Sequence, residues 1–295
     1  MDNEFILIDR IQKIQQIIKQ YGEENFYISF SGGKDSTVLS FLIDMAIPGN
    51  KIPRVYANTG IELNMISNFV RELAQIDDRI QIIKPSTPIK QMLETVGYPF
   101  KSKEHSTYLS VYQNNKAITK SVNRYLNPDE TRKSFGCPKI LRYQFNDGFN
   151  IKISKKCCDE LKKKPLHKWQ KENNKKYSII GVMQSEGGER SSAQCLAFRN
   201  KKLYAFQPLA PISKDWEEWF IKEYNVKICD IYKPPYNFNR TGCKGCPYNI
   251  HLQRDLETLD KFFPNERKQC EIIWEPVYKE YRRINYRLKG GKHNA

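Results

Sequence analysis

The sequence predicts an α/β protein, in which a doubly wound, mostly parallel sheet is followed by a C-terminal helical extension that carries cysteines. Two observations support this. Short runs of β-branched and aromatic residues alternate with stretches of helical periodicity, the pattern of a parallel sheet covered on both faces. The 295 residues, 39% of them hydrophobic, suffice for one large α/β domain with an appendage or for two small domains.

The individual elements follow from residue type and spacing. Isoleucines recur at helical intervals between residues 5 and 21, which predicts an amphipathic helix that ends at Gly22. The aromatic run at 26–30 predicts a buried strand, and a helix is expected at 37–43 after the next turn. Further strands are expected at 54–58, 80–83 and 177–182, with a helix near 63–75.

We expect an α/β domain over residues 1–235, with an insertion at 98–150 that covers its ligand. Residues 236–295 form a segment that packs on this domain. The sequence has no run of eighteen apolar residues that would span a membrane. Its acidic start lacks the basic and apolar regions of a secretory signal. These features favour a cytoplasmic protein without a membrane partner, whose eight cysteines serve metal or redox chemistry rather than disulfides.

The charge balance indicates an anionic partner. The chain has 49 basic and 33 acidic side chains, a formal net charge of +16. Between residues 152 and 176 there are ten lysines and three acids. Such an excess favours nucleic acid or a phosphorylated ligand. The alternative is a lysine-rich surface that is simply solvated.

A glycine-rich turn, Ser31-Gly32-Gly33-Lys34-Asp35-Ser36, joins the first strand to the next helix. Adjacent glycines let its N–H groups converge, and the positive end of the helix dipole completes an anion site. Lys34 adds a point charge, and the hydroxyls of Ser29, Ser31 and Ser36 can donate hydrogen bonds. Asp35 would order the turn or help to hold Mg²⁺. The alternative is a serine-capped turn without a ligand.

This turn resembles the signature of the PP-loop ATP pyrophosphatase superfamily, in the branch of phosphoadenosine phosphosulfate (PAPS) reductases and related sulfurtransferases. The resemblance implies the adenine nucleotide alpha hydrolase-like fold, with about five parallel strands and the nucleotide at their carboxyl ends. Residues 57–62 are similar to the family's turn near the adenosine, which implies that Asn58, Thr59 and Gly60 contact the nucleotide. Residues 98–105 are similar to a segment of phage and mobile-element members.

Two cysteine pairs, Cys157-Cys158 and the Cys-x-x-Cys of Cys243 and Cys246, can supply four thiolates to one metal centre. From the residues alone, zinc and an iron–sulfur cluster both stay open. The pairing resembles that of adenylyl-sulfate reductases, whose Cys-Cys and Cys-x-x-Cys bind a [4Fe–4S] cluster. The resemblance therefore implies that these four cysteines are cluster ligands.

The other cysteines leave alternatives open. The two pairs could be unrelated, with one pair buried as small hydrophobic residues. A rival ligand set combines the Cys-x-x-Cys with Cys270 and either Cys137 or Cys158. Cys270 falls on a predicted helix, where core packing is expected. Cys195 and Cys229 have apolar neighbours and are expected to be structural.

The resemblance also bears on catalysis. Lys34 and Asp35 belong to the turn, and Arg190 lies where the reductases carry an arginine that contacts phosphate or sulfate. A surface arginine is the alternative. Thioredoxin-coupled reductases end in a mobile Glu-Cys-Gly tail whose cysteine attacks the sulfate sulfur. In this chain no cysteine follows Cys270, so a reductase would have to use Cys270 as its nucleophile.

Three functions are consistent with the resemblance. The favoured one is ATP-dependent adenylation of DNA or tRNA, with pyrophosphate released beside Mg²⁺ and sulfur supplied by a cysteine desulfurase or a thiol donor protein. The second is thiol-dependent reduction of adenylyl sulfate or PAPS to sulfite. The third is a regulator that binds a nucleotide and a cluster without catalysis.

Overall fold

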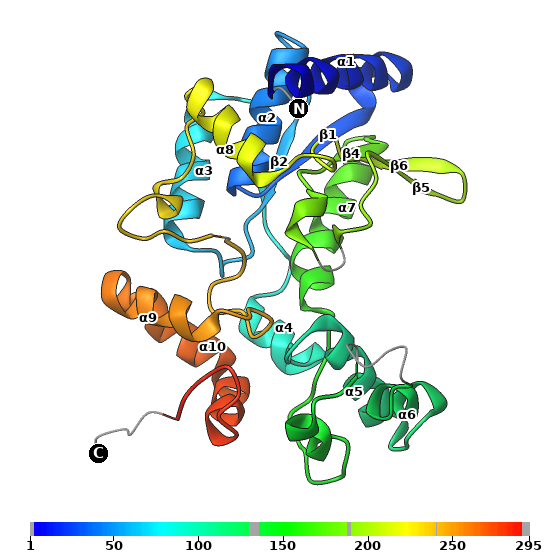
Figure 1. The fold of residues 1–295 in the computed structure, drawn as a ribbon, viewed down its shortest axis with the longest axis vertical. Coiled ribbons are helices and arrows are strands. Elements are labelled where there is room, and N and C mark those ends of the chain that lie inside the picture. Colours follow the sequence, from blue (N-terminus) through cyan, green and yellow to red (C-terminus); the bar gives the residue numbers. More distant parts are fainter. Residues whose placement is uncertain (1–2, 130–135, 188–189, 240, 291–295) are drawn as a thin grey trace. The chain divides into compact units, whose positions relative to one another are not determined.

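The structure, a computed structural model, describes residues 3–129, 136–187, 190–239 and 241–290 (Figure 1). The chain forms two compact units. The sheet unit comprises Met1–Asn58, Asn64–Pro85 and Lys164–Thr241. The helical unit comprises Thr59–Leu63, Ser86–Lys163 and Gly242–Ala295. Each unit is described by itself.

The sheet unit contains a six-stranded sheet with the order β3-β2-β1-β4-β6-β5. Its strands are β1 (Phe26–Phe30), β2 (Arg54–Ala57), β3 (Ile80–Ile83), β4 (Tyr177–Ile179), β5 (Leu196–Arg199) and β6 (Lys202–Phe206). Neighbouring strands are parallel from β3 to β6, and β5 runs antiparallel to β6 at the edge. The predicted α/β class and the parallel sheet are confirmed.

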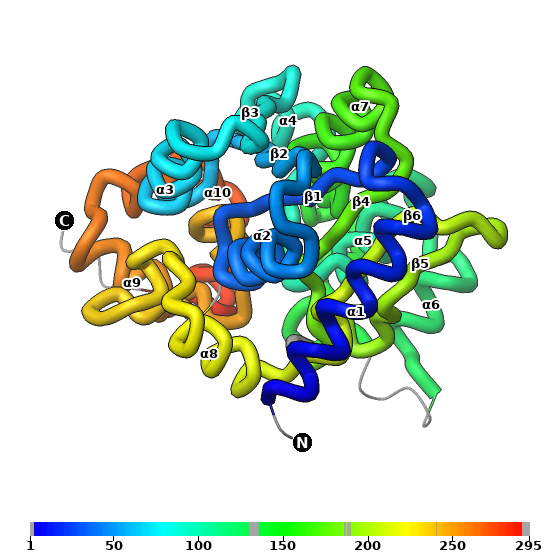
Figure 2. Tube along the Cα trace, turned by 90° about the horizontal axis from the view of Figure 1, so that it is seen from above, coloured from blue at the N-terminus to red at the C-terminus, as the bar shows by residue number. Residues whose placement is uncertain are grey.

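Helices cover both faces of this sheet (Figure 2). The helices of the unit are α1 (Asn3–Tyr21), α2 (Lys34–Ala46), α3 (Asn64–Ile76), α7 (Lys164–Glu172) and α8 (Lys214–Glu223). Alternation along β1 sorts its side chains: Phe26 and Ile28 belong to a large core with residues of α1, α2, α3 and α8. Tyr27 points to the other face and packs on Trp169 of α7, with ring centroids 5.3 Å apart. The sheet is therefore doubly wound.

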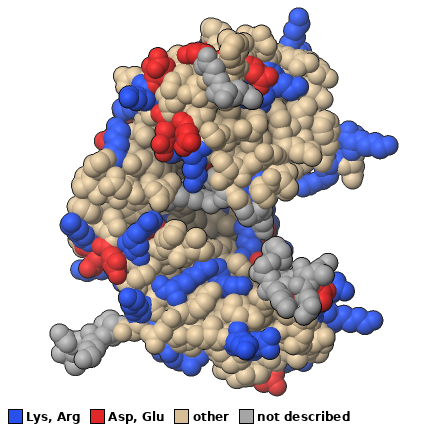
Figure 3. Space-filling view, viewed as in Figure 1, with Lys and Arg blue, Asp and Glu red and all other residues tan. Residues whose placement is uncertain are grey.

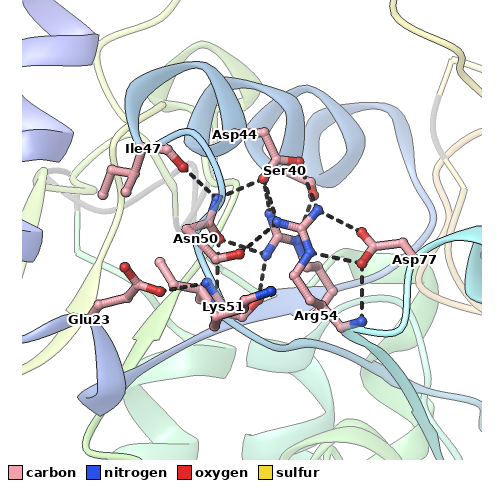
Figure 4. Close-up of polar contacts among 10 residues, drawn as sticks. Glu23, Ser40, Asp44, Ile47, Asn50, Lys51, Arg54 and Asp77 are labelled. Atoms are coloured by element: carbon pink, nitrogen blue, oxygen red, sulfur yellow. Dashed lines mark hydrogen bonds and ion pairs between the residues drawn. The ribbon is translucent and has the colours of Figure 1, made fainter.

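A buried charge cluster lies at the start of β2, at the amino ends of the parallel strands (Figure 4). Arg54 is fully buried and donates to Ser40, Asn50 and Asp44, at 3.1, 2.9 and 2.6 Å. Arg79 donates to the same Asp44 carboxylate at 2.8 Å. Because the Arg54 guanidinium is hydrogen-bonded on every nitrogen, the cluster has the character of a structural anchor.

The helical unit contains α4 (Ile89–Val96), α5 (Lys103–Asn115), α6 (Lys120–Leu126), α9 (Leu252–Phe262) and α10 (Pro264–Arg283), together with a π-helical turn at Asp159–Lys163. In the part of the chain that the structure describes, no helix combines the length and apolarity needed to cross a membrane.

The boundaries of the units differ from the expected division at residue 235. Residues 98–150, expected as an insertion into the α/β domain, share a unit with the C-terminal segment. Tyr281 of α10 explains this: its hydroxyl donates to the Pro247 carbonyl at 2.9 Å and accepts from the Lys101 amide at 2.7 Å. These contacts join the supposed insertion to the extension.

Candidate functional site

The turn at 31–36 is folded largely by its own hydroxyls. The Ser31 amide donates to the Ser36 hydroxyl at 3.2 Å, and the Gly33 amide donates to the Ser31 hydroxyl at 3.2 Å. The Ser36 hydroxyl and the Thr37 hydroxyl both donate to the Gly33 carbonyl, at 2.9 and 3.0 Å. Ser29, a further predicted contact, lies in β1 and pairs with Val55. The serines thus shape the turn at the N-terminus of α2.

Two glycines allow close backbone approaches here. Gly32 has φ of 68°, and a Cβ on it would lie 2.5 Å from Val70 of α3. Gly181 follows β4, and a Cβ on it would lie 3.0 Å from the Asp35 carbonyl oxygen. The β4 strand therefore ends against the first turn of α2, at the carboxyl edge of the sheet, where parallel α/β sheets bind their ligands.

Lys34 is held by a residue that the sequence analysis missed. Its ammonium nitrogen lies 3.1 Å from Oε2 of Glu217, a carboxylate of α8 that is fully buried. Among the described residues, neither Glu217 oxygen has a hydrogen-bond partner of good geometry. Burial, followed by the negative charge of Asp35, raises the pKa of Glu217 from 4.5 to about 7, although Lys34 lowers it.

The turn at residues 58–60, the second segment predicted to contact the nucleotide, is divided between the two units. Asn58 ends in the sheet unit, where its amide donates to the Ile83 carbonyl at 2.8 Å. Thr59 begins the helical unit, and its amide and hydroxyl donate to the buried Glu62 carboxylate at 3.0 and 2.8 Å. Gly60 has φ of 79° with open space around it, so the conformation alone favours glycine. Glu62 therefore fixes this turn.

The four predicted ligand cysteines all lie in the helical unit. Cys243 forms a β-bridge with Glu62, and the Cys246 amide donates to the Cys243 carbonyl at 3.2 Å. The pKa of Cys157 is raised by its hydrogen bond with Cys158, by burial, and by the charges of Cys158, Cys246 and Cys243. Burial raises the pKa of Cys243 to about 11 and of Cys246 to about 12. Two segments far apart in sequence thus bring their thiols into one electrostatic neighbourhood.

Lys162 is the cation with the largest effect on these thiols. It belongs to the π-helical turn, and its ammonium lies 3.3 Å from the Glu62 carboxylate. Burial lowers its pKa, but the charges of Cys243 and Glu62 outweigh burial and raise it above the ordinary range. The pKa of Cys158 is lowered mainly by its hydrogen bond with Cys157. The positive charge of Lys162 lowers it further.

Across the described ranges, no three His, Cys, Asp or Glu side chains are spaced to hold a single metal ion. The donor set itself is four thiols, and thiolates are soft ligands suited to zinc and to iron–sulfur clusters. A four-iron cluster uses each thiolate on a different iron, so its ligands stand farther apart than those of one ion. The chemistry of the set fits such a cluster.

Cys270 lies in a different environment. It is fully buried in α10, and burial raises the pKa of its thiol to about 12. A Cβ on Gly245 would lie 2.8 Å from its sulfur, so the backbone of the Cys-x-x-Cys segment packs directly on it. A buried, protonated thiol is a poor nucleophile. Cys137 and Cys229 are also buried, and Cys195 is half-buried.

Arg190 is half-buried, and its amide donates to the Gly187 carbonyl at 3.2 Å. It follows β4 by a short connection, in which residues 188–189 lie outside the described residues. The expected contact of Arg190 with phosphate or sulfate stays a prediction.

Residues 107–249, slightly less than half of the chain, match the family model of the phosphoadenosine phosphosulfate reductase domain. Over this segment the chain is similar to the PAPS reductase domain. The matched segment includes all four candidate ligand cysteines but not the turn at 31–36. The family resemblance is confirmed at this level. The narrower assignment to a phage or DNA phosphorothioation type stays a prediction. No curated protein matches the sequence.

Solved structures are similar to the chain over most of its length. A PAPS reductase from Candida auris in a phosphate complex is 12% identical, with 79% of this chain and 93% of that chain covered and a TM-score of 0.43. An NH3-dependent NAD synthetase from Campylobacter jejuni is 14% identical, with 94% and 95% covered and a TM-score of 0.40. The U34-tRNA thiolase NcsA from Methanococcus maripaludis, with its [4Fe–4S] cluster, is 16% identical, with 99% and 83% covered and a TM-score of 0.39. No function follows from likenesses at this level.

Proposed function

We propose that the PAPS reductase-like protein is an adenine-nucleotide-dependent sulfurtransferase that adenylates a nucleic acid and replaces the activated oxygen with sulfur. A [4Fe–4S] cluster held by Cys157, Cys158, Cys243 and Cys246 belongs to this proposal, with zinc as the alternative metal. The observation that carries the proposal is the meeting of four thiols and Lys162 in one unit, where Cys243 forms a β-bridge with Glu62 of the turn at Thr59.

The nucleotide part rests on the turn at the N-terminus of α2. Backbone N–H groups and the helix dipole favour the phosphates of ATP there. Lys34 would add positive charge once the phosphates replace Glu217 as the partner of its ammonium. Asp35 would order the turn or help to hold Mg²⁺. Asn58, Thr59 and Gly60 would contact the adenosine, with Glu62 setting the conformation of the turn through Thr59.

The reaction divides into two balanced steps. An acceptor oxygen attacks the α-phosphate of ATP, so an oxygen–phosphorus bond forms while the bond to the β-phosphate breaks and pyrophosphate leaves. A cysteine desulfurase or a thiol donor protein would supply sulfur as a persulfide. A second thiol would reduce this persulfide, forming a disulfide and releasing hydrosulfide, which then attacks the acceptor atom. The bond from that atom to the adenylated oxygen breaks, and AMP leaves. A cluster held by all four cysteines would have a thiolate on every iron, so it would supply electrons rather than an open site for sulfur.

Anaerobic purification followed by iron, sulfide and bound-nucleotide analysis tests the metal. We expect about four iron and four sulfide per chain, with broad absorbance near 400 nm. Cys157→Ser and Cys243→Ser should each lose most of the iron, while Cys229→Ser, a buried cysteine outside the group, should keep it. Stoichiometric zinc without sulfide would replace the cluster by a zinc site. Full metal retention in both ligand variants would refute the thiol assignment.

Pyrophosphate release tests the reaction. We expect it from ATP only when single-stranded DNA or tRNA is present, and Lys34→Ala should reduce it while the fold persists. Pyrophosphate release without any nucleic acid, or its absence with both DNA and tRNA, would contradict the proposal.

Sulfonucleotide reduction is a second candidate, because the matched family is that of PAPS reductases. It requires sulfite release from adenylyl sulfate or PAPS with a thiol reductant and no ATP. The burial of Cys270, the nucleophile that this candidate would use, weighs against it.

A further inference from the structure

A polar cavity of about 870 Å³ lies within the helical unit, away from the turn at 31–36 in sequence. Its walls come from the end of α4, from α5 and from residues 146–156. We propose that this cavity binds one or two nucleotides of a single-stranded nucleic acid. The inference rests on the proposed function for its purpose, because the bound strand would be the sulfur acceptor.

The walls of the cavity are braced. Gln113 of α5 uses both ends of its amide: its nitrogen donates to the Ile151 carbonyl at 2.8 Å, and its oxygen accepts from the Ile153 amide at 2.9 Å. The Tyr98 amide donates to the Lys152 carbonyl at 2.8 Å, which pairs the two segments like neighbouring strands. The cavity is therefore a preformed feature of the unit, as binding sites usually are.

The charge of the lining suits a phosphate. Lys116, Lys152 and Lys156 line the cavity, and Asp147 is the one acidic residue among the lining residues, all of which are described. The Asp147 carboxylate accepts a long hydrogen bond from the Tyr112 hydroxyl, at 3.4 Å. Lys152 donates to the Thr95 carbonyl at 2.6 Å, which fixes its ammonium at the wall and leaves two further N–H donors.

The remaining lining suits a base. The rings of Tyr112 and Phe149 are half-buried and face the same cavity, and asparagine amides at 114, 146 and 150 add donors and acceptors. Unstacked bases bind to aromatic rings and amides in this way, whereas the bases of a duplex are stacked and unavailable. The combination therefore favours a single strand over a duplex.

The charge of the whole chain supports the same partner. On the face drawn in Figure 3, Lys and Arg side chains outnumber Asp and Glu, in keeping with the net charge of +16. Lys156 directly precedes Cys157 in the chain, so the cavity wall continues into the cysteine pair. A strand held in this cavity would have a phosphate near Lys156, which is one residue away from the proposed ligand Cys157.

Fluorescence anisotropy with labelled single-stranded DNA and RNA of about 20 nucleotides tests the inference. The double variant Lys116→Gln/Lys156→Gln should lose two phosphate contacts. At a slope of about 0.7 per contact for single strands, affinity at 0.1 M salt should fall about 25-fold, and the log–log salt slope should fall by about 1.4. Tyr112→Leu should weaken binding several-fold without changing the slope.

The matched control is Lys120→Gln/Lys279→Gln, which removes the same charge from exposed positions of the same unit. Equal losses in both double variants would overturn the inference, because only the net charge would then matter. Displacement of the strand by AMP at similar affinity would also overturn it, in favour of a mononucleotide site. Tighter binding of a duplex would do the same.

Thermal denaturation checks that each variant is folded, and the Tyr112 variant keeps the test decisive if a lysine variant unfolds. Binding is measured without ATP. Loss of strand binding with pyrophosphate release intact would therefore remove this inference alone. Strand binding without pyrophosphate release would remove the proposed function and leave this site standing.

Discussion

Glu217 gives the sharpest prediction, because it is a buried carboxylate that pairs with Lys34, the lysine of the candidate phosphate turn. Glu217→Gln keeps the shape of the side chain and removes its titration. The oxygens of Glu217 have no well-oriented donor among the described residues, so the neutral amide loses little hydrogen bonding. What changes is the cost of ionising a group that the fold keeps away from water.

The magnitude follows from the pKa. A rise from 4.5 in the unfolded chain to about 7 in the fold corresponds to roughly 3 kcal/mol, at 1.36 kcal/mol per unit. Because the folded-state pKa is the higher one, the contribution of Glu217 is fully present below pH 4.5 and is lost as the pH rises through 7. Wild-type protein should therefore lose up to about 3 kcal/mol relative to Glu217→Gln between pH 4.5 and pH 8.

Urea unfolding followed by tryptophan fluorescence at several pH values measures this difference. Trp216, directly next to Glu217, is buried in the core of the sheet unit and reports on its unfolding. Glu218→Gln, an exposed neighbour on α8, is the matched control and should leave the pH profile unchanged. A constant difference between wild type and Glu217→Gln across this pH range would refute the reasoning. It would mean that Lys34 fully neutralises the carboxylate.

Three further predictions follow from single contacts. Arg54→Ala should cost about 3 kcal/mol in urea unfolding, since it removes a fully buried guanidinium from its hydrogen-bond acceptors, whereas exposed Lys51→Ala should cost less than about 0.5. Gly181→Ala should weaken ATP binding about tenfold in equilibrium dialysis, as its Cβ would press on the α2 turn, while Gly242→Ala, with open space around it, should not. Cys270→Ser should lower the melting temperature but leave turnover intact; loss of sulfite formation by a folded variant would instead support a reductase.

The sheet could be predicted where local sequence decides the structure. β1, β2 and β3 lie within a residue of their expected bounds, because each is a short apolar run closed by turn residues. β4 ends at Ile179 rather than at 182, since Gly181 is taken up by its approach to α2. The hairpin of β5 and β6 was missed because its turn uses Asn200 and Lys201 at positive φ in place of glycine.

The candidate site was predictable only in part. The glycine turn and the cysteine spacing are visible as motifs, but burial of a charged side chain is a tertiary property. Glu217 had a weak signal, since it lies between Trp216 and Phe220 on the apolar side of α8. Lys162 had a weaker one, four residues after Cys158 in a turn that is π-helical. A π-helical turn is frequent at functional sites, but sequence spacing does not reveal it.

The two buried charged side chains of the sheet unit, Arg54 and Glu217, differ in how completely they are hydrogen-bonded. At the amino ends of the strands, Arg54 is surrounded by hydrogen-bond acceptors. A hydroxyl, an amide oxygen and a carboxylate all accept from its guanidinium. At the carboxyl end, Glu217 has the Lys34 ammonium 3.1 Å away but no aligned donor among the described residues, near glycines that allow close backbone approaches. A buried polar group without partners costs stability, so it persists where a ligand or a proton completes it. Satisfied hydrogen bonds thus anchor the sheet at one edge, whereas at the other edge Lys34 offsets only part of the cost of burying Glu217.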